Sequence, residues 1–327
     1  MIRFFKSPQP AALFVIPFII IALWLRIGLS CSPVVDETSL PLWKSIGNAL
    51  SILPGWLNFI LLVSLLSFEA IYFNLMVNKH EVLYKSSYLP SLLFAFIISS
   101  TPGLIQFHPV HLVNLLVLII FDRTFSMFKN EKANSALFDS SFLTGIAALI
   151  YFPSLLLMVV LVISLSILRP FKLKEWIIVI IGFSLPFFFA SVYSFWNHAL
   201  WPFWTHYFSF FPSDRPIFLI TKNTALLTLT VTIGSLLFFS LLKLRVNHNK
   251  NVIRTRSFQQ IFFFFLLLCG ISIGISRHIQ IIHFAILAIP VSLFISYFYL
   301  SAKKRIRLYE FTLWAFIVIV LWNQFTA

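Results

Sequence analysis

The sequence predicts an all-α protein, a polytopic transmembrane bundle of about eleven helices, because long apolar segments follow one another along the chain. Of its residues, 60% are hydrophobic and 10% are charged, and the mean hydropathy is +0.95. Soluble domains carry about 25% charged residues, so the solvent of this chain is expected to be lipid. In lipid the backbone polar groups need partners within the protein, and non-alternating segments of about 17–25 residues favour helices over barrel strands.

The apolar segments define the expected helices in order. Arg26 interrupts the first, which we interpret as a retained helix rather than a cleaved signal peptide. Only Tyr151, Phe152 and Pro153 separate the short fifth and sixth segments. Because proline breaks or bends a helix, these two segments form either two short helices or one long kinked helix. The segments cover residues 11–30, 53–76, 88–105, 110–127, 138–150, 153–169, 175–196, 223–242, 258–276, 279–300 and 309–325.

The distribution of Lys and Arg decides between these alternatives. With two short helices, 19 of the 24 basic residues fall on the side of the N-terminus, whereas one long helix would make the division nearly even. Cytoplasmic loops are enriched in Lys and Arg. We therefore predict two helices, a cytoplasmic N-terminus and an external C-terminus in a bacterial cytoplasmic membrane. Basic residues in short loops also explain the net charge of +14 without a nucleic-acid partner.

The chain is expected to form one integral membrane domain, residues 1–327, because it shows no soluble domain and no inverted repeat of the kind found in many transporters. Within it, residues 1–200 form a helical core with an outer loop at 31–52. Residues 201–327 add an outer interfacial segment and four further helices. Cys31 and Cys269 are not expected to form a disulfide, because one of them lies inside a predicted helix.

Two adjacent acidic residues, Asp36 and Glu37, follow the first helix on the predicted outer face, which otherwise holds only Asp214 as an acid. Carboxylates at this place could act as a general base or hold a divalent cation, the one cofactor that the sequence suggests. The alternative is a solvated loop without a catalytic role. Asp36 and Glu37 are the candidate catalytic residues.

Histidines mark the next predicted turn on this face. His108 and His111 are three residues apart at the start of a helix, so they could share a face and act as acid, base or ligand. Two histidines do not complete a zinc site, and no metal-binding set is assigned. Both are candidate substrate-binding residues, and structural histidines at a membrane interface are the alternative.

Two further outer segments contain candidate substrate-binding residues. Trp201 and His206 belong to an aromatic stretch that predicts an amphipathic helix in the membrane interface, or a surface on which a sugar or lipid chain stacks. Arg277 and His278 occupy a short turn between two helices. A guanidinium matches phosphate oxygens bidentately, although an arginine that extends to the interface explains this position equally well.

Four features of residues 10–200 resemble polytopic glycosyltransferases of the GT-C fold, which use polyprenyl-phosphate sugars. They are the acidic pair after the first helix, the turn Asn78-Lys79-His80-Glu81 before a helix ending in Thr101-Pro102-Gly103, the basic stretch to Lys132 before Phe142-Leu143-Thr144-Gly145, and the two short helices before Arg169-Pro170-Phe171-Lys172. The chain also resembles multi-pass membrane proteins of Bacteroidota, for which the resemblance implies no activity.

The GT-C resemblance implies a GT-C-like arrangement of the first seven helices and transfer of a sugar from a lipid-linked donor to an acceptor at the outer face. Asp36 or Glu37 would act as base or metal partner, and Arg277 would hold the donor phosphate. The chain departs from that family because it lacks a larger soluble outer domain, and because Gln106 and His108 replace the second acidic motif.

Three functions follow as hypotheses. A glycosyltransferase predicts that Asp36, Glu37, His108 and Arg277 line one cavity open to the outer leaflet. A transporter or flippase of a lipid-linked substrate predicts polar residues in the membrane midplane, where Glu69 is the clearest candidate. A non-catalytic subunit of an envelope assembly predicts helix faces that pair with another membrane protein. The expected partners are a lipid-linked sugar donor, membrane lipids and, for the last hypothesis, envelope proteins.

Overall fold

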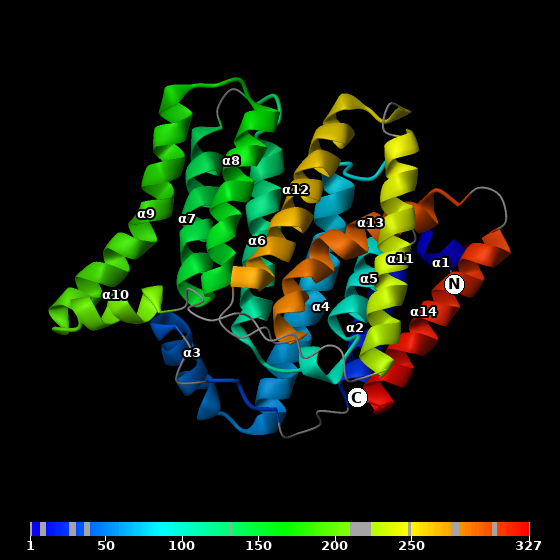
Figure 1. Ribbon diagram of the computed structural model, residues 1–327, viewed down its shortest axis with the longest axis horizontal. Coiled ribbons are helices and arrows are strands. Elements are labelled where there is room, and N and C mark those ends of the chain that lie inside the picture. The colour runs from blue at the N-terminus through cyan, green and yellow to red at the C-terminus, as the bar shows by residue number, and fades with distance from the viewer. Residues whose placement is uncertain are drawn as a thin grey trace.

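A computed structural model shows the chain as a bundle of α-helices, which confirms the predicted all-α class (Figure 1). Within the described residues the only extended pairing is one isolated bridge between Pro33 and Phe107. The structure describes residues 2–6, 11–25, 31–35, 40–130, 133–209, 224–247, 250–275, 281–302 and 306–326.

Each of the eleven predicted apolar segments contains a helix, and three shorter helices, α1, α3 and α10, lie outside those segments. The helices are α1 (Ile2–Lys6), α2 (Ala11–Trp24), α3 (Pro41–Ser51), α4 (Gly55–Lys79), α5 (Leu89–Ile98), η2 (Pro102–Leu104), α6 (Pro109–Ser126), α7 (Asn134–Ile150), η3 (Phe152–Leu156), α8 (Leu157–Leu168), α9 (Leu173–Trp196), α10 (Leu200–Phe208), α11 (Thr224–Asn247), α12 (Ile253–Ile275), η6 (Ile281–Leu287), α13 (Ala288–Leu300) and α14 (Ile306–Thr326).

Seven helical segments in the described part of the chain are long and apolar enough to cross a membrane: α4, α6, α9, α11, α12, α14 and the continuous segment from η6 to α13. The other apolar helices are shorter. The ten residues of α5, all of them buried, span about 15 Å, half of a bilayer core of about 30 Å. The structure therefore supports a multi-pass membrane bundle, with fewer helices of spanning length than the eleven that the sequence predicts.

The break at Pro153 produces two helices, as predicted. The helix α7 ends at Ile150, and η3 begins at Phe152 and continues into α8. At the far end of α8, Arg169 Nη1 donates to the carbonyl of Met127 at 3.3 Å, ahead of the start of α7. The end of α8 thus lies near the start of α7, so α7 and α8 form an antiparallel pair.

Small residues bring α7 and α9 into close contact. A Cβ atom added at Gly145 would lie 2.6 Å from the carbonyl oxygen of Phe183 and 2.9 Å from Cγ of Pro186. A Cβ atom at Gly182 would collide with Ser141 in the same way. Small residues at helix contacts let two backbones approach closely in apolar bundles. The glycines therefore fix the distance between α7 and α9.

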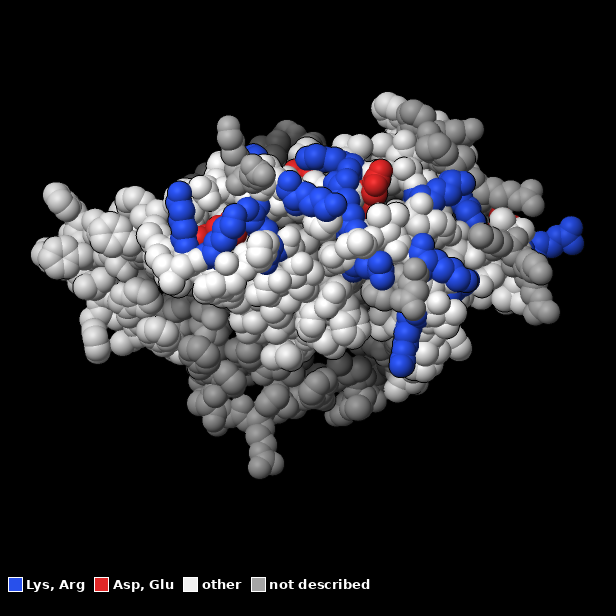
Figure 2. All heavy atoms as spheres, turned by 90° about the horizontal axis from the view of Figure 1, so that it is seen from above, with Lys and Arg blue, Asp and Glu red and all other residues white. Residues whose placement is uncertain are grey.

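Basic side chains gather at one end of the bundle, here called the basic end, which Figure 2 shows face-on. Ion pairs connect the helices there, because Lys79 Nζ lies 2.8 Å from Asp122 Oδ1, and Arg169 Nη2 lies 2.8 Å from Glu175 Oε1. The side chains of the second pair are only 7% and 6% exposed. The helix α1 also lies at this end, since Lys6 Nζ donates to Ala302 O at 2.9 Å.

The last turn of α14 lies at the opposite end. There Asn323 donates to the carbonyl of Ala225 at the start of α11, and Gln324 donates to the carbonyl of Ser99 after α5. The first and last described helices thus begin and finish at opposite ends of the bundle. This is the arrangement that an odd number of crossings produces.

We expect Gly182→Val to destabilise the protein, because its side chain would meet Ser141 and the carbonyl of Phe138 at 3.2 Å. Overpacking of this kind costs about 1–3 kcal/mol. Gly234→Val in α11 is the matched control, since no heavy atom lies within 4 Å of its Cβ position. Thermal unfolding of the purified variants in detergent measures the difference. Equal melting temperatures for the two variants would contradict the close packing of α7 on α9.

Candidate functional site

Four segments that are distant in sequence converge at the end opposite the basic end, here called the histidine end. Residues 31–35 lie along Phe107, because Val34 N donates to Phe107 O at 2.9 Å. A Cβ atom on Gly103 of η2 would lie 3.2 Å from Ile281 of η6. Tyr151, between α7 and η3, is hydrogen-bonded to His283 of η6. These contacts bring the loops after α2, α5, α7 and α12 together.

His108 is held at the centre of this region by the start of α6. Pro109 follows it, and a residue before proline favours an extended backbone, as the φ of −116° and ψ of 151° show. His108 caps the helix because its Nδ1 accepts from Val110 N at 3.3 Å. Its ring centroid lies 5.9 Å from that of Tyr151 and 6.2 Å from that of His283, edge to face in both cases.

The imidazole of His108 is neutral at neutral pH. Burial lowers its pKa well below the ordinary value, and the nearby His283 and His111 lower it further. A neutral imidazole provides one donor and one acceptor. With the Tyr151 hydroxyl and His283, it therefore forms a group of hydrogen-bonding side chains, and its own donor and acceptor suit hydroxyl groups of a ligand.

His111 has a structural role. Its fully buried ring places Nε2 3.0 Å from the carbonyl of Gln106, so this nitrogen donates and fastens the preceding turn to α6. The ring also meets Trp24 of α2 edge to face at 5.8 Å. Trp24 Nε1 in turn donates to Ser99 Oγ at 2.6 Å. His111 thus supports the backbone that presents His108.

Four of the other predicted site residues belong to loops, and two, Trp201 and His206, belong to the aromatic stretch. Asp36, Glu37, Arg277 and His278 lie outside the described residues. Two described segments that flank them in the chain, residues 31–35 and 281–287, both belong to the histidine end.

Leu40 is the first described residue after the acidic pair. It packs in one apolar cluster with Leu149, Phe152, Phe203 and Tyr207. The described residues on the two sides of the acidic pair therefore lie at the His108 turn and at the start of η3.

The aromatic stretch forms the predicted amphipathic helix, α10, which lies across the end of the bundle (Figure 1). Phe203 and Tyr207 face inward, and Tyr207 Oη donates to Ala148 O at 3.2 Å. Trp201 points outward, with 78% of its surface exposed. His206 lines a surface groove with Lys44 of α3. Trp201 and His206 are thus not part of the His108 cluster.

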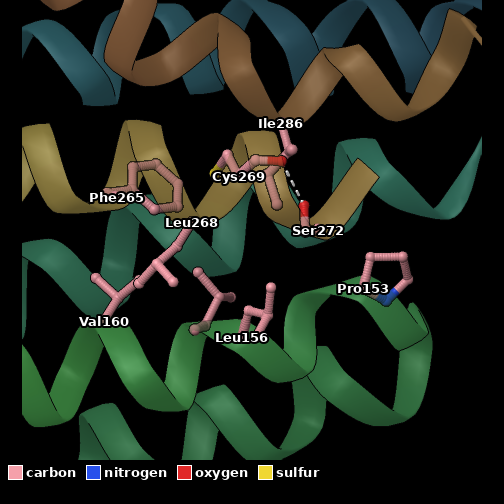
Figure 3. Close-up of a pocket in the computed structure, with 9 residues that line it drawn as sticks. Pro153, Leu156, Val160, Phe265, Leu268, Cys269, Ser272 and Ile286 are labelled. Carbon is pink, nitrogen blue, oxygen red and sulfur yellow. Dashed lines mark hydrogen bonds between the residues drawn. The ribbon is translucent and has the colours of Figure 1, made fainter. Parts of the chain in front are cut away.

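A small apolar cavity lies inside the bundle. It has a volume of about 10 Å³ and lies between α12, η3, α8 and η6, lined by Pro153, Leu156, Cys269 and Ile286 among others (Figure 3). Its one hydroxyl, Ser272 Oγ, already donates to Cys269 O at 2.7 Å. A volume of this size holds about one water molecule, so this cavity is too small for a substrate.

The sequence analysis missed Tyr151 and His283. From the sequence, Tyr151 belongs only to the break before Pro153, and His283 belongs only to an apolar segment. Their contact joins residues that are 132 positions apart. The one sequence signal was the polarity of His283 within a segment that is otherwise apolar. Cys31 and Cys269 are both buried, and neither forms a disulfide. No group of three or more His, Cys, Asp or Glu among the described residues could hold a metal ion.

No protein-family model matches the chain, and no curated protein and no solved structure is significantly similar to it.

The low pKa of His108 predicts a loss of stability in acid. In the unfolded chain His108 takes up a proton near pH 6.5, whereas in the folded chain burial opposes this protonation. The free energy of unfolding therefore falls as the pH drops below about 6.5, by up to about 1.4 kcal/mol per pH unit. We expect His108→Asn, which keeps a helix-capping side chain, to reduce the difference in melting temperature between pH 7.5 and pH 5.5. The exposed His198→Asn is the control. Equal pH dependence in His108→Asn and the unaltered protein would show that His108 is charged or accessible.

Proposed function

We propose that this protein transfers a sugar from a polyprenyl-phosphate-linked donor to an acceptor at the outer face of a bacterial cytoplasmic membrane. The observation that carries the proposal is the convergence at the histidine end. The described residues that precede Asp36 and Glu37 lie beside Phe107, and the cluster of His108, Tyr151 and His283 follows directly. On this proposal the carboxylates of the acidic pair and the cation Arg277 act together with these hydrogen-bonding side chains.

The proposed orientation places the basic end in the cytoplasm and the histidine end outside. Positive residues favour the cytoplasmic side, and Lys and Arg gather at the basic end (Figure 2). The N-terminus is then cytoplasmic and the C-terminus external. A lipid-linked donor would approach from the surrounding leaflet.

The chemistry assigns a role to each group. Asp36 or Glu37 accepts the proton of the acceptor hydroxyl while its oxygen attacks the anomeric carbon of the sugar. The bond from this carbon to the phosphate oxygen breaks, and the lipid phosphate leaves with the electron pair. Arg277 stabilises that negative charge. A single displacement of this kind inverts the anomeric centre.

The cluster of His108, Tyr151 and His283 positions the sugar. His108, Tyr151 and His283 offer donors and acceptors to sugar hydroxyls, and their packing holds them in place. A divalent cation on the acidic pair would serve the same reaction by stabilising the leaving phosphate.

A carrier of a lipid-linked substrate is the second candidate, because one observation favours it. Glu69 and Asn74 on α4 are fully buried, and their side-chain polar atoms have no hydrogen-bond partner among the described residues. Polar groups at this depth of a spanning helix are costly and mark substrate or ion pathways in membrane proteins. A non-catalytic envelope subunit has no comparable observation in its favour.

We expect Asp36→Asn, Glu37→Gln and Arg277→Ala to impair transfer, and loss of the residue that acts as base to lower the rate about 10²–10⁴-fold. Complementation of a deletion strain, with profiling of its surface glycans, measures the effect. Asp139→Asn and Arg123→Ala are matched controls, because this exposed pair, 4.0 Å apart, belongs to the basic end. Membrane insertion of every variant is checked. Full complementation by all three outer variants would reject the transferase.

Glu69→Gln separates the two candidate functions. The substitution keeps the shape of the side chain and removes its ability to ionise, and Glu69 lies on α4 away from the converging loops. The transferase predicts an unchanged glycan profile. If the protein is a carrier that uses this carboxyl, cells with Glu69→Gln show the glycan profile of the deletion strain. Transport of the lipid-linked substrate in vesicles gives the direct measurement.

A further inference from the structure

Glu69 lies deep inside the bundle, on the helix α4. This helix runs from Gly55 to Lys79, so Glu69 is about 21 Å along the axis from the first residue and about 15 Å from the last. None of its surface is exposed. The helix is long and apolar enough to span a membrane, and a bilayer core is about 30 Å thick. A carboxyl at this position of a spanning helix therefore lies in the hydrocarbon region.

The face of α4 around Glu69 is apolar. Side chains three, four and seven residues apart share one face of a helix, and the residues at these distances from Glu69 include Leu66, Phe73 and Met76. All three are buried. Asn74 is five residues away and belongs to another face. On its own helix the carboxyl therefore meets hydrocarbon rather than polar groups.

The helices that pack most closely against α4 bring no partner to Glu69. They are α2, α5 and α6, and neither α2 nor α5 contains an ionisable residue. On α6, His111 lies at the histidine end, whereas Asp122 and Arg123 lie at the basic end. Both carboxyl oxygens of Glu69 are buried, and neither has a hydrogen-bond partner among the described residues.

The ionisable groups at the end of α4 interact with one another. Lys79 Nζ and His80 Nε2 lie 2.8 and 2.7 Å from Asp122 Oδ1. The phenol of Tyr72, one turn after Glu69, interacts with the same carboxylate. No salt bridge in the described part of the chain includes Glu69. The basic end therefore leaves the Glu69 carboxyl without a counter-ion.

Glu175 shows what a buried carboxylate requires. Arg169 Nη2 lies 2.8 Å from Glu175 Oε1, and Arg169 Nε donates to Oε2 at 3.0 Å. Burial of an ionised carboxylate without such a partner is strongly unfavourable, and the group takes up a proton instead. Glu69 is buried at least as completely as Glu175, and no described cation reaches it. The neutral acid is therefore its favoured form.

We propose that Glu69 is an intramembrane proton-binding site. Its carboxylate takes up one proton from water as α4 packs into the bundle, and the O–H bond that forms keeps the side chain neutral at neutral pH. A proton suits this position better than a metal ion, because no group of three or more His, Cys, Asp or Glu among the described residues could hold one. Ionisable residues inside membrane segments form proton relays in pumps and transporters.

Release of this proton needs a change in the surroundings of Glu69. The acid ionises where its side chain reaches water or a cation, so proton loss is linked to a movement of α4 or to the arrival of a positively charged ligand. The inference does not depend on sugar transfer, because none of the residues around Glu69 belongs to the His108 cluster. In a carrier, this proton would be the coupling ion.

Infrared spectroscopy of the purified full chain at pH 7.5 tests the proposal, in a detergent without ester or carboxyl groups. A protonated carboxyl has a C=O stretching band that is separate from the bands of carboxylates and amides. We expect this band in the unaltered protein and its complete loss in Glu69→Gln, which keeps the shape of the side chain without the acid. Asp139→Asn, at a carboxyl that is 39% exposed, is the matched control and should keep the band.

Absence of the band from the unaltered protein overturns the proposal, since Glu69 is then ionised. A band that persists in Glu69→Gln also overturns it, because the acid is then another residue. Should Glu69→Gln aggregate, Glu69→Asp keeps the acid on a shorter side chain and should shift the band, whereas an unshifted band rejects the assignment to Glu69. These results do not depend on complementation by Asp36→Asn, so the proton site and the proposed transfer can fail separately.

Discussion

Backbone polar groups in a lipid-solvated bundle need partners inside the protein, and this requirement determines where irregular structure is tolerated. The helix α5 ends after ten residues, at Ile98, and the residues that follow it, Ser99 to Thr101, are buried. Trp24 reaches Ser99 from α2, and Gln324 reaches the same residue from α14. The surrounding helices thus supply the partners that lipid cannot. A polar site becomes affordable where non-helical backbone is already enclosed.

The same requirement explains the convergence of the loops. The short helix η6 carries His283 at the point where α13 begins, and Asn114 of α6 donates to the carbonyl of Ala285 at 3.2 Å. Val34 N donates to Phe107 O, and Pro33 and Phe107 form an isolated bridge like those between strands of a sheet. Each loop at the histidine end therefore stabilises another loop. The hydrogen bonds that make the fold possible also bring His108, Tyr151 and His283 together.

Hydropathy and charge predicted most of the fold because they act along the sequence. Apolar segments located the helices, and Pro153 with the distribution of basic residues predicted the α7 and α8 pair. Hydropathy could not show that α5 is too short to cross, since the apolar residues after Ile98 leave the helix while remaining buried. The contact of Tyr151 with His283 depends on packing across the bundle and leaves no local signal. The acidic pair and Arg277 remain predictions.

The two ends of the bundle use opposite electrostatics. At the basic end, the buried Arg169 is paired with Glu175, and removal of one partner would leave a buried charge. At the histidine end, burial disfavours the protonated imidazole of His108, so this side chain is neutral at neutral pH. A neutral imidazole offers one donor and one acceptor, which suits the hydroxyls of a sugar, whereas a phosphate needs a cation such as Arg277. The proposed transfer therefore assigns the sugar to the His108 cluster and the donor phosphate to Arg277.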